Sequence, residues 1–148
     1  MRRVCVDASL AVRWFVSEPG SAEAIALLTD WLDTAELWAP DLLYTECANA
    51  LRRKVAAGLM TTGDASDGLR GLLETEMHLV PDRETAEEAL EAALQVGLTV
   101  WDASYLVVAR RVEAELWTAD GELHRRGQRA YPRIRLLEWS QSEHPPER

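Results

Sequence analysis

Short apolar or β-branched runs alternate with longer stretches of helical periodicity along almost the whole sequence. This pattern predicts strands at residues 3–6, 36–40, 78–81, 115–120 and 133–139, and helices at residues 9–16, 21–33, 42–57, 61–77, 82–97, 101–114 and 121–128. Alternating strands and helices are typical of a parallel sheet whose crossover helices cover both of its faces. The sequence therefore predicts an α/β fold: a three-layer α/β/α sandwich with a central, mainly parallel sheet of about five strands.

The residues at the ends of several helices predict where those helices begin and stop. The predicted N-caps are Ser21, Asp41 and Asp82, and the predicted stops are Gly58 and Gly97. The helix at residues 101–114 is apolar on most of its sides, so we expect it to be a central, buried helix.

Length and composition limit the class of protein. A chain of 148 residues, 47% hydrophobic and 28% charged, fits one globular domain, which we place at residues 1–141, with the polar residues 142–148 as a C-terminal tail. We expect two reduced, buried cysteines and no membrane segment. No signal peptide pattern is visible, because Asp7 and Arg13 interrupt the first apolar stretch, so we expect a cytoplasmic protein.

Four acidic residues stand in apolar or small-residue surroundings, unlike most of the 25 Asp and Glu. Asp7 and Asp120 each follow a predicted strand, where parallel α/β sheets place their ligand sites. Glu46 lies at the edge of an apolar helix stripe, with Asn49 one turn away and able to hydrogen-bond it. Asp102 lies near the start of the almost wholly apolar helix. We interpret these four residues as a candidate site.

Each of the four acids also has a structural explanation. Asp7 could cap the following helix, and Asp120 could be a turn residue. Glu46 could reach solvent, and Asp102 could be an acid favoured by the helix dipole. Taken together, four converging carboxylates need a cation, since two unit charges about 4 Å apart repel by about 4 kcal/mol at an effective dielectric near 20. Oxygen ligands without Cys or His favour Mg²⁺ or Mn²⁺.

A net charge of −9 is unlike that of a passive nucleic-acid binder, but it is compatible with an enzyme that uses metal to cleave nucleic acid. The one basic run of three residues is Arg52, Arg53 and Lys54. It is either a solvated helix face or a set of RNA phosphate contacts. The early aromatic residues are either core residues or part of a partner groove; these are Trp14, Phe15, Trp31 and Trp38.

Four sequence blocks occur in a characteristic order within residues 4–126: VDASLAVRWF, APDLLYTECANALRR, TVWDASYLVVARR and LWTADGELHR. In this order they resemble the PIN-domain ribonucleases, and within them the VapC toxins of bacterial type II toxin–antitoxin systems. The resemblance implies an endoribonuclease that uses Mg²⁺ or Mn²⁺ for in-line hydrolysis of RNA. It leaves transfer, ribosomal and messenger RNA as possible substrates.

The resemblance also implies roles for individual residues. The acids that match the family's catalytic and metal-binding site are Asp7, Glu46, Asp102 and Asp120, and the neighbouring hydroxyl residues are Ser9 and Thr118. Trp101 stands where many relatives carry Tyr, which changes the pocket wall or RNA stacking. The implied partners are an RNA substrate, a cognate VapB-like antitoxin that binds the early helices, and a second copy of the chain in a homodimer.

Three other functions compete with this interpretation. A phosphoacceptor receiver domain normally needs a lysine after its last strand, whereas the only lysine here, Lys54, lies in a predicted helix. A haloacid-dehalogenase-like phosphatase needs Asp-x-Asp after the first strand, and here the third residue is Ser9. A binding module that has lost its chemistry would be distinguished from a nuclease by a metal-dependent cleavage assay with an EDTA control.

Overall fold

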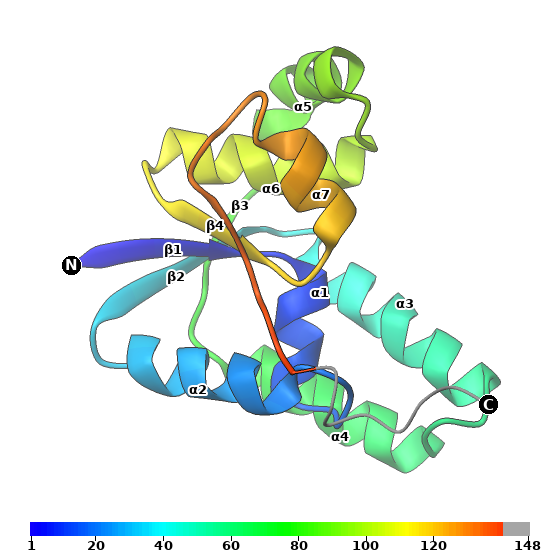
Figure 1. Cartoon of the computed structure of the whole chain (residues 1–148). Helices are drawn as coiled ribbons and strands as arrows, with labels where there is room; N and C mark the ends of the chain where they lie inside the picture. Colours follow the sequence, from blue (N-terminus) through cyan, green and yellow to red (C-terminus); the bar gives the residue numbers. More distant parts are fainter. Residues whose placement is uncertain (141–148) are drawn as a thin grey trace.

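The computed structural model describes residues 1–140, in which a five-stranded sheet lies between two layers of helices (Figure 1). In chain order the elements are β1 Arg2–Val6, α1 Ala8–Ala11, the 3-10 helix η1 Val12–Trp14, α2 Ser21–Trp31, β2 Ala35–Pro40, α3 Leu43–Ala56, α4 Thr62–Glu74, β3 His78–Val80, α5 Asp82–Val96, α6 Val100–Arg111, β4 Glu115–Thr118, α7 Gly121–Gly127 and β5 Ile134–Leu136. The predicted tail at residues 142–148 lies outside the described residues.

The sheet is parallel throughout, with the strand order β3-β2-β1-β4-β5. The predicted parallel sheet of about five strands is therefore confirmed. β1 lies in the centre between β2 and β4, and Val6 at its end is in register with Trp117 of β4. This register brings the residues that follow β1 next to those that follow β4, at the carboxyl edge of the sheet.

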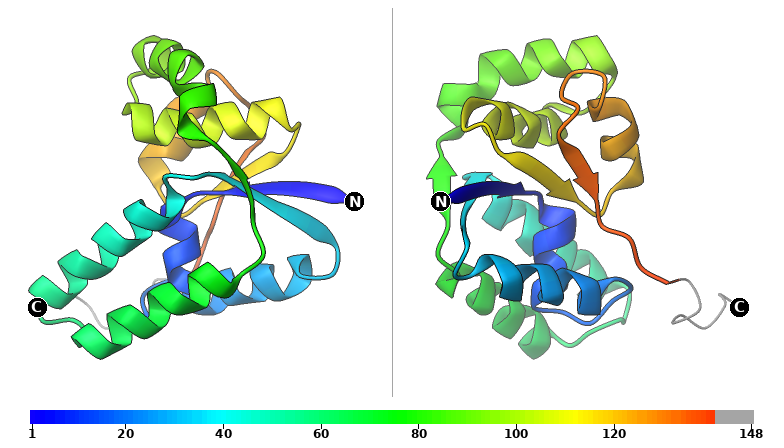
Figure 2. Two further views of the ribbon diagram at one scale, coloured as in Figure 1. Left: turned by 180° about the vertical axis from the view of Figure 1, so that it is seen from behind. Right: turned by 60° about the vertical axis from the view of Figure 1, so that its left-hand side comes forward.

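The helices form two layers, with α1 to α4 on one face of the sheet and α5 to α7 on the other (Figures 1 and 2). α6 packs against β1, β2 and β4, and residues 103–109 within it are all buried, which confirms the prediction of a central helix. α3 and α4 pack against each other and form a hairpin that projects beyond the sheet (Figure 2). This hairpin forms one side of the carboxyl edge.

The core includes β1 itself, in which Val4, Cys5 and Val6 are fully buried between the two helical layers. A continuous apolar run of this kind is typical of a central parallel strand. Both cysteines are free and buried, as the sequence predicts. Among the early aromatic residues, Trp14 and Trp31 are buried in the core, and Phe15 and Trp38 pack against it.

Several element ends differ from their predicted positions. The predicted helix at residues 9–16 is divided into α1 and η1. The last strand is shorter than predicted, since β5 covers only Ile134–Leu136 of residues 133–139. Ser21 is the first residue of α2 and not its N-cap, because Gly20 takes that position in the left-handed region at φ 89°. The Ser21 hydroxyl instead donates to the carbonyl of Val16 at 2.8 Å. The face of Trp139 lies against Gly20, which leaves no room for a side chain there.

The predicted caps of α3 and α5 are also wrong, for a shared reason. Leu42 precedes α3 and Pro81 precedes α5. Asp41 instead accepts a hydrogen bond from the backbone N–H of Asp82 at 3.2 Å. This contact links the ends of the neighbouring strands β2 and β3, so tertiary packing has overridden local capping.

The predicted stops are confirmed, since Gly58 and Gly97 both have φ 74° at the ends of α3 and α5. No single helix within residues 1–140 is long and apolar enough to cross a membrane. Within these residues, α5 and α6 reach the length and apolar composition of a membrane span only when they are counted together. The pair is bent by 112° at the break between the two helices.

Candidate active site

Asp7 lies at the centre of the candidate site, directly after β1, with 4% of its surface exposed. Its Oδ1 accepts hydrogen bonds from the backbone N–H of Leu10 at 3.1 Å and from the Ser9 hydroxyl at 2.8 Å. Its Oδ2 accepts a hydrogen bond from the Thr118 hydroxyl at 2.6 Å. Asp7 is thus the N-cap of α1 and is also bonded across the sheet to the end of β4.

The two hydroxyls also accept hydrogen bonds from the backbone. The Ser9 hydroxyl accepts from the backbone N–H of Ala119 at 2.9 Å, and the Thr118 hydroxyl accepts from the backbone N–H of Asp120 at 3.0 Å. Each hydroxyl also lies within donating distance of the Asp7 carboxylate, and the two hydroxyl oxygens lie 3.2 Å from each other. The network therefore joins the β1–α1 and β4–α7 junctions and presents only donors to Asp7.

Burial and hydrogen bonding shift the pKa of Asp7 in opposite directions. Burial raises the pKa of its carboxyl group to about 7, while the donors Thr118, Ser9 and Leu10 lower it and the charge of Asp102 raises it. The donors favour the ionised form, but they do not outweigh the loss of solvation. Asp7 is a carboxylate held in position at a cost in solvation energy, which a nearby cation would offset.

Asp102 lies in the first turn of α6, half-buried, at the same edge of the sheet. Its backbone N–H donates to the side chain of Thr99, the N-cap of the helix, at 3.1 Å. Burial raises the pKa of Asp102 to about 6, with further increases from the charges of Asp120 and Glu46. The charges of two of the predicted acids therefore raise the pKa of Asp102, and the charge of Asp102 raises the pKa of Asp7.

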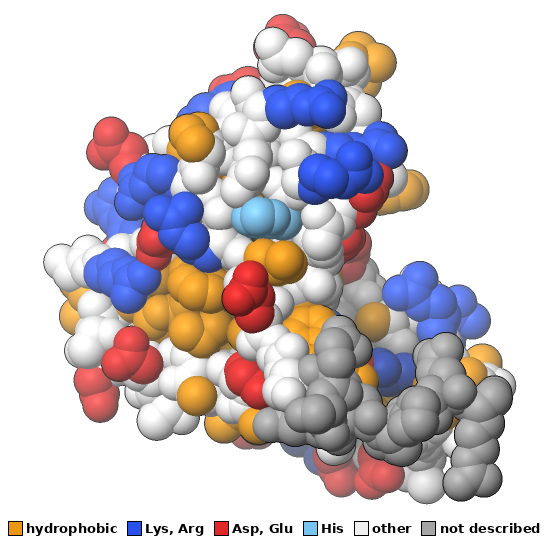
Figure 3. Space-filling model, viewed as in Figure 1, with side chains coloured by type: hydrophobic (Ala, Val, Ile, Leu, Met, Phe, Trp, Pro, Cys, Tyr) orange, Lys and Arg blue, Asp and Glu red, His pale blue; other side chains and the backbone are white. Residues whose placement is uncertain are grey.

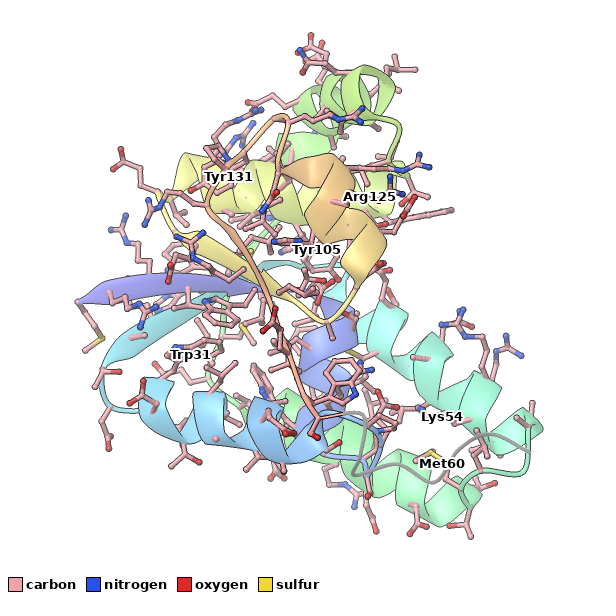
Figure 4. All side chains as sticks on the ribbon, viewed as in Figure 1. Trp31, Lys54, Met60, Tyr105, Arg125 and Tyr131 are labelled. Carbon is pink, nitrogen blue, oxygen red and sulfur yellow. The ribbon has the colours of Figure 1, made fainter. Side chains whose placement is uncertain are left out.

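Glu46 extends from α3 and is oriented by a residue of the opposite helical layer. The hydroxyl of Tyr105, which is buried in α6, donates to Oε1 of Glu46 at 2.7 Å (Figure 4). Burial raises the pKa of Glu46, while the hydrogen bond from Tyr105 and the charge of Arg53 lower it. The structure differs from the predicted Asn49–Glu46 hydrogen bond, because exposed Asn49 accepts from Nε of Arg52 at 3.0 Å.

Asp120 is the N-cap of α7, and it is half-buried. Its Oδ1 accepts from the backbone N–H groups of Glu122 at 2.9 Å and Leu123 at 3.3 Å. The hydrogen bonds that position Asp120 therefore fall on one carboxylate oxygen, as the hydrogen bond from Tyr105 falls on one oxygen of Glu46.

The four acids come from four different elements at one edge of the sheet, and their charges act on one another. Within residues 1–140, however, no group of three or more His, Cys, Asp or Glu side chains is close enough to form a ready-made metal site. Asp7 is fixed by its hydrogen bonds, whereas the other three acids are partly exposed. The arrangement is a cluster of acidic residues around one carboxylate that is fixed by hydrogen bonds.

The basic run Arg52–Lys54 is divided between different surroundings. Lys54 forms an ion pair with Glu18, which also pairs with Arg13 at 3.0 Å (Figure 4). Arg53 is in none of the ion pairs within residues 1–140, and it lines a pocket together with Glu46. On the face shown in Figure 3, basic side chains gather over the upper helical layer and over α3, with acidic side chains between them.

Sequence reasoning missed two features of this edge. Tyr105 lies three residues after Asp102 on α6, a spacing that places both on one helix face and could have indicated its role. Asp41 and Asp82 follow β2 and β3 as Asp7 and Asp120 follow β1 and β4. Burial and contact with Asp41 raise the pKa of Asp82 to about 6, and the charge of Glu46 adds to this.

The sequence matches one family model and one known ribonuclease. The family model described as the PIN domain matches residues 4–128. Ribonuclease VapC3 of Pyrobaculum aerophilum is 31% identical over 123 residues, which cover 82% of this chain and 92% of that protein.

Two solved structures of low sequence identity share the fold. VapC20 of Mycobacterium tuberculosis, described as a Sarcin-Ricin loop cleaving toxin, superposes with a TM-score of 0.66 at 16% identity, over 81% of this chain and 92% of that one. A toxin–antitoxin complex from Klebsiella pneumoniae contains a chain that superposes with a TM-score of 0.57 at 13% identity, over 91% and 98% of the two chains.

Proposed function

This chain belongs to the PIN-domain family, and we propose that it is a VapC-type toxin: a Mg²⁺- or Mn²⁺-dependent endoribonuclease that hydrolyses RNA phosphodiester bonds and is inhibited by a cognate antitoxin. The observation that carries this proposal is the surroundings of Asp7. A buried carboxylate receives only hydrogen-bond donors, and the charge of Asp102 acts on it. Three further acids lie at the same edge of the sheet.

The donor set fits a hard divalent cation. A carboxylate has about four lone pairs, and the donors to Asp7 occupy two on Oδ1 and one on Oδ2. Oδ2 therefore keeps a lone pair for a cation. The hydrogen bonds that position Glu46 and Asp120 fall on Oε1 and Oδ1, which favours their second oxygens for the same purpose. We infer that Asp7, Asp102 and Asp120 hold the metal, with Glu46 bound to it directly or through water.

A divalent cation bound by these acids lowers the pKa of water and offsets negative charge on the phosphate. The chain's own residues prepare the pocket for this chemistry. Ser9 and Thr118 favour the ionised form of Asp7 and fix its orientation, and Tyr105 fixes the orientation of Glu46. Arg53, at the rim beside Glu46, supplies positive charge that attracts an RNA phosphate toward an otherwise acidic pocket.

The test is cleavage of total RNA by the purified chain. With Mg²⁺ or Mn²⁺ the protein should cut within RNA chains, and EDTA should stop the reaction. Asp102→Asn should abolish cleavage without unfolding the protein, because Asp102 is partly exposed. Asp7→Asn should do the same. Asp33→Asn, at an exposed aspartate outside the pocket, is the matched control and should cut normally. Full activity in purified Asp102→Asn protein would overturn the assignment.

We further propose a single nuclease domain at residues 1–141 and a cytoplasmic location. The proposed partners are a VapB-like antitoxin and a second copy of the chain as a homodimer. The proposed antitoxin is supported by the similarity to VapC3 and by the fold shared with a chain of a toxin–antitoxin complex. A small gene beside the one for this chain, encoding a DNA-binding protein that suppresses its toxicity and co-purifies with it, is the expected finding. Normal growth on induction of the chain alone would argue against the toxin role.

A further inference from the structure

Trp101 is one of the most exposed large apolar side chains of this protein, with 64% of its surface accessible. It lies in the first turn of α6, directly before Asp102. Its side chain lines a pocket whose other wall comes from α3 and includes Glu46, Asn49 and Arg53. An exposed tryptophan thus lies next to Asp102 in the chain and lines one pocket with Glu46 and the guanidinium group of Arg53.

The exposure of Trp101 is not explained by packing. The residues that follow Asp102 in α6 are buried without interruption from Ala103 to Ala109, so the helix obtains its packing from that segment. An indole ring exposed beside a polar pocket is instead suited to a planar ligand, because aromatic faces stack on nucleobases. Tryptophan also presents more ring surface than the other aromatic residues.

The charge of the pocket adds a second argument. The chain has a net charge of −9, and the pocket is lined by Glu46 and lies beside Asp102, so phosphate contacts alone would hold RNA weakly. Base stacking is insensitive to these charges and supplies affinity where electrostatic attraction cannot. Arg53, which forms no ion pair within residues 1–140, is placed to contact the adjoining phosphate.

We propose that Trp101 stacks on an RNA base and holds an unpaired nucleotide beside the carboxylates, while Arg53 contacts the neighbouring phosphate. This proposal rests on the proposed ribonuclease function and adds to it the residue that holds the base. A base can stack on a side chain only when its face is open, so Trp101 contacts an unpaired nucleotide. Trp101 is a substrate-binding residue, and its contribution differs from that of Arg53 in its response to salt.

The test is a fluorescence titration with a short oligouridylate, in the presence of Mg²⁺, in an Asp102→Asn background that prevents cleavage. Stacking quenches indole emission, so RNA should quench part of the signal and Trp101→Ala should remove that part. Trp101→Ala should weaken binding roughly 5- to 150-fold, the usual range for loss of one stacked base. Trp101→Phe should retain most of the affinity. Val100→Ala, at the preceding and less exposed residue, is the matched control and should bind normally.

Salt and strand pairing separate stacking from electrostatic contact. The loss caused by Trp101→Ala should be the same at low and high salt, whereas Arg53→Gln should reduce the salt dependence of binding. Pairing the oligouridylate with oligoadenylate should make binding indifferent to Trp101→Ala. In the protein with Asp102 intact, Trp101→Ala should raise KM for RNA and leave kcat nearly unchanged.

The outcomes distinguish this proposal from the function on which it rests. If the chain with Asp102 intact neither binds nor cleaves RNA, the ribonuclease function is wrong and the Trp101 proposal is wrong with it. If that chain cleaves RNA and the Trp101→Ala protein binds oligouridylate equally well, only the Trp101 proposal is refuted. Should Trp101→Ala fail to fold, two other results decide the matter: loss of affinity in Trp101→Phe, or absence of RNA-induced quenching in the protein that retains Trp101, would contradict stacking.

Discussion

Asp7 should make the metal-free protein less stable as the pH rises toward neutrality. Its pKa in the folded protein is about 7, against its usual value of 3.8, because burial disfavours the charged form. The folded state therefore binds this proton more tightly than the unfolded state does. The sign follows directly: stability is lost between the unfolded and the folded pKa, as the pH rises from about 4 to about 7.

The magnitude can be worked out from these two values. A folded pKa of about 7 against 3.8 corresponds to a full penalty of about 4 kcal/mol well above pH 7. Between pH 5 and pH 8 the part that develops is about 2.5 kcal/mol, since some of the penalty is already present at pH 5. Asp7 is only 4% exposed, so solvent screening reduces this figure little. Asp7→Asn removes the titrating group and should remove this dependence.

The assay is urea unfolding in EDTA at pH 5 and pH 8, for the original protein and for Asp7→Asn. The free energy of unfolding of the original protein, taken relative to Asp7→Asn, should fall by about 2.5 kcal/mol between the two pH values. The difference in unfolding free energy between the two proteins cancels, to first order, the contributions of the other titrating groups, including Asp102. Asp33→Asn serves as the control for an exposed aspartate and should follow the original protein.

Two results would refute this reasoning. If both proteins show the same change in unfolding free energy between pH 5 and pH 8, Asp7 does not titrate in that range. The second result is a gain in stability of the original protein, relative to Asp7→Asn, as the pH rises. In that case the hydrogen bonds from Ser9, Leu10 and Thr118 outweigh the loss of solvation, and burial of the ionised carboxylate does not destabilise the metal-free protein.

Three further predictions concern the same site and the core. Mg²⁺ or Mn²⁺ should raise the midpoint of thermal unfolding in the original protein, and Asp102→Asn should abolish most of that rise. Thr118→Val should cost about 1–3 kcal/mol in chemical unfolding and reduce RNA cleavage, because it leaves the N–H of Asp120 and one oxygen of Asp7 without their partner. Trp31→Ala should cost about 3–5 kcal/mol, measured in the same way, because this side chain is 1% exposed and its ring lies 5.7 Å from that of Trp117.

The layers, the parallel sheet and the central helix were predictable because they depend on patterns that extend over many residues. α6 illustrates this: the largely apolar segment at residues 103–109 is enough to predict a buried helix. The starts of the helices depend on single contacts, and these were less predictable. Asp41 would cap α3 if local hydrogen bonding decided the matter, but its carboxylate is used by the backbone of Asp82, 41 residues away.

The candidate site likewise has features that the sequence could predict and features that it could not. Asp7 and Asp120 were predictable as neighbours, because both follow strands of a parallel sheet whose carboxyl ends meet at one edge. The partner of Glu46 was not, since helix spacing pointed to Asn49, one turn away, whereas the structure supplies Tyr105 from the opposite layer. Which residue reaches Glu46 depends on how far α3 and α6 are separated, and no local pattern records that separation.

Helix capping and metal binding were alternatives for Asp7 when only the sequence was considered, and the positions of its two oxygens show how both can hold. The N–H of Leu10 and the hydroxyl of Ser9 bind Oδ1, so this oxygen serves the cap and the local turn. The Thr118 hydroxyl binds Oδ2 and leaves a lone pair on that oxygen. Capping therefore orients the carboxylate without using all of its capacity. The contacts that cap α1 also fix the direction in which Asp7 presents its charge to the other acids.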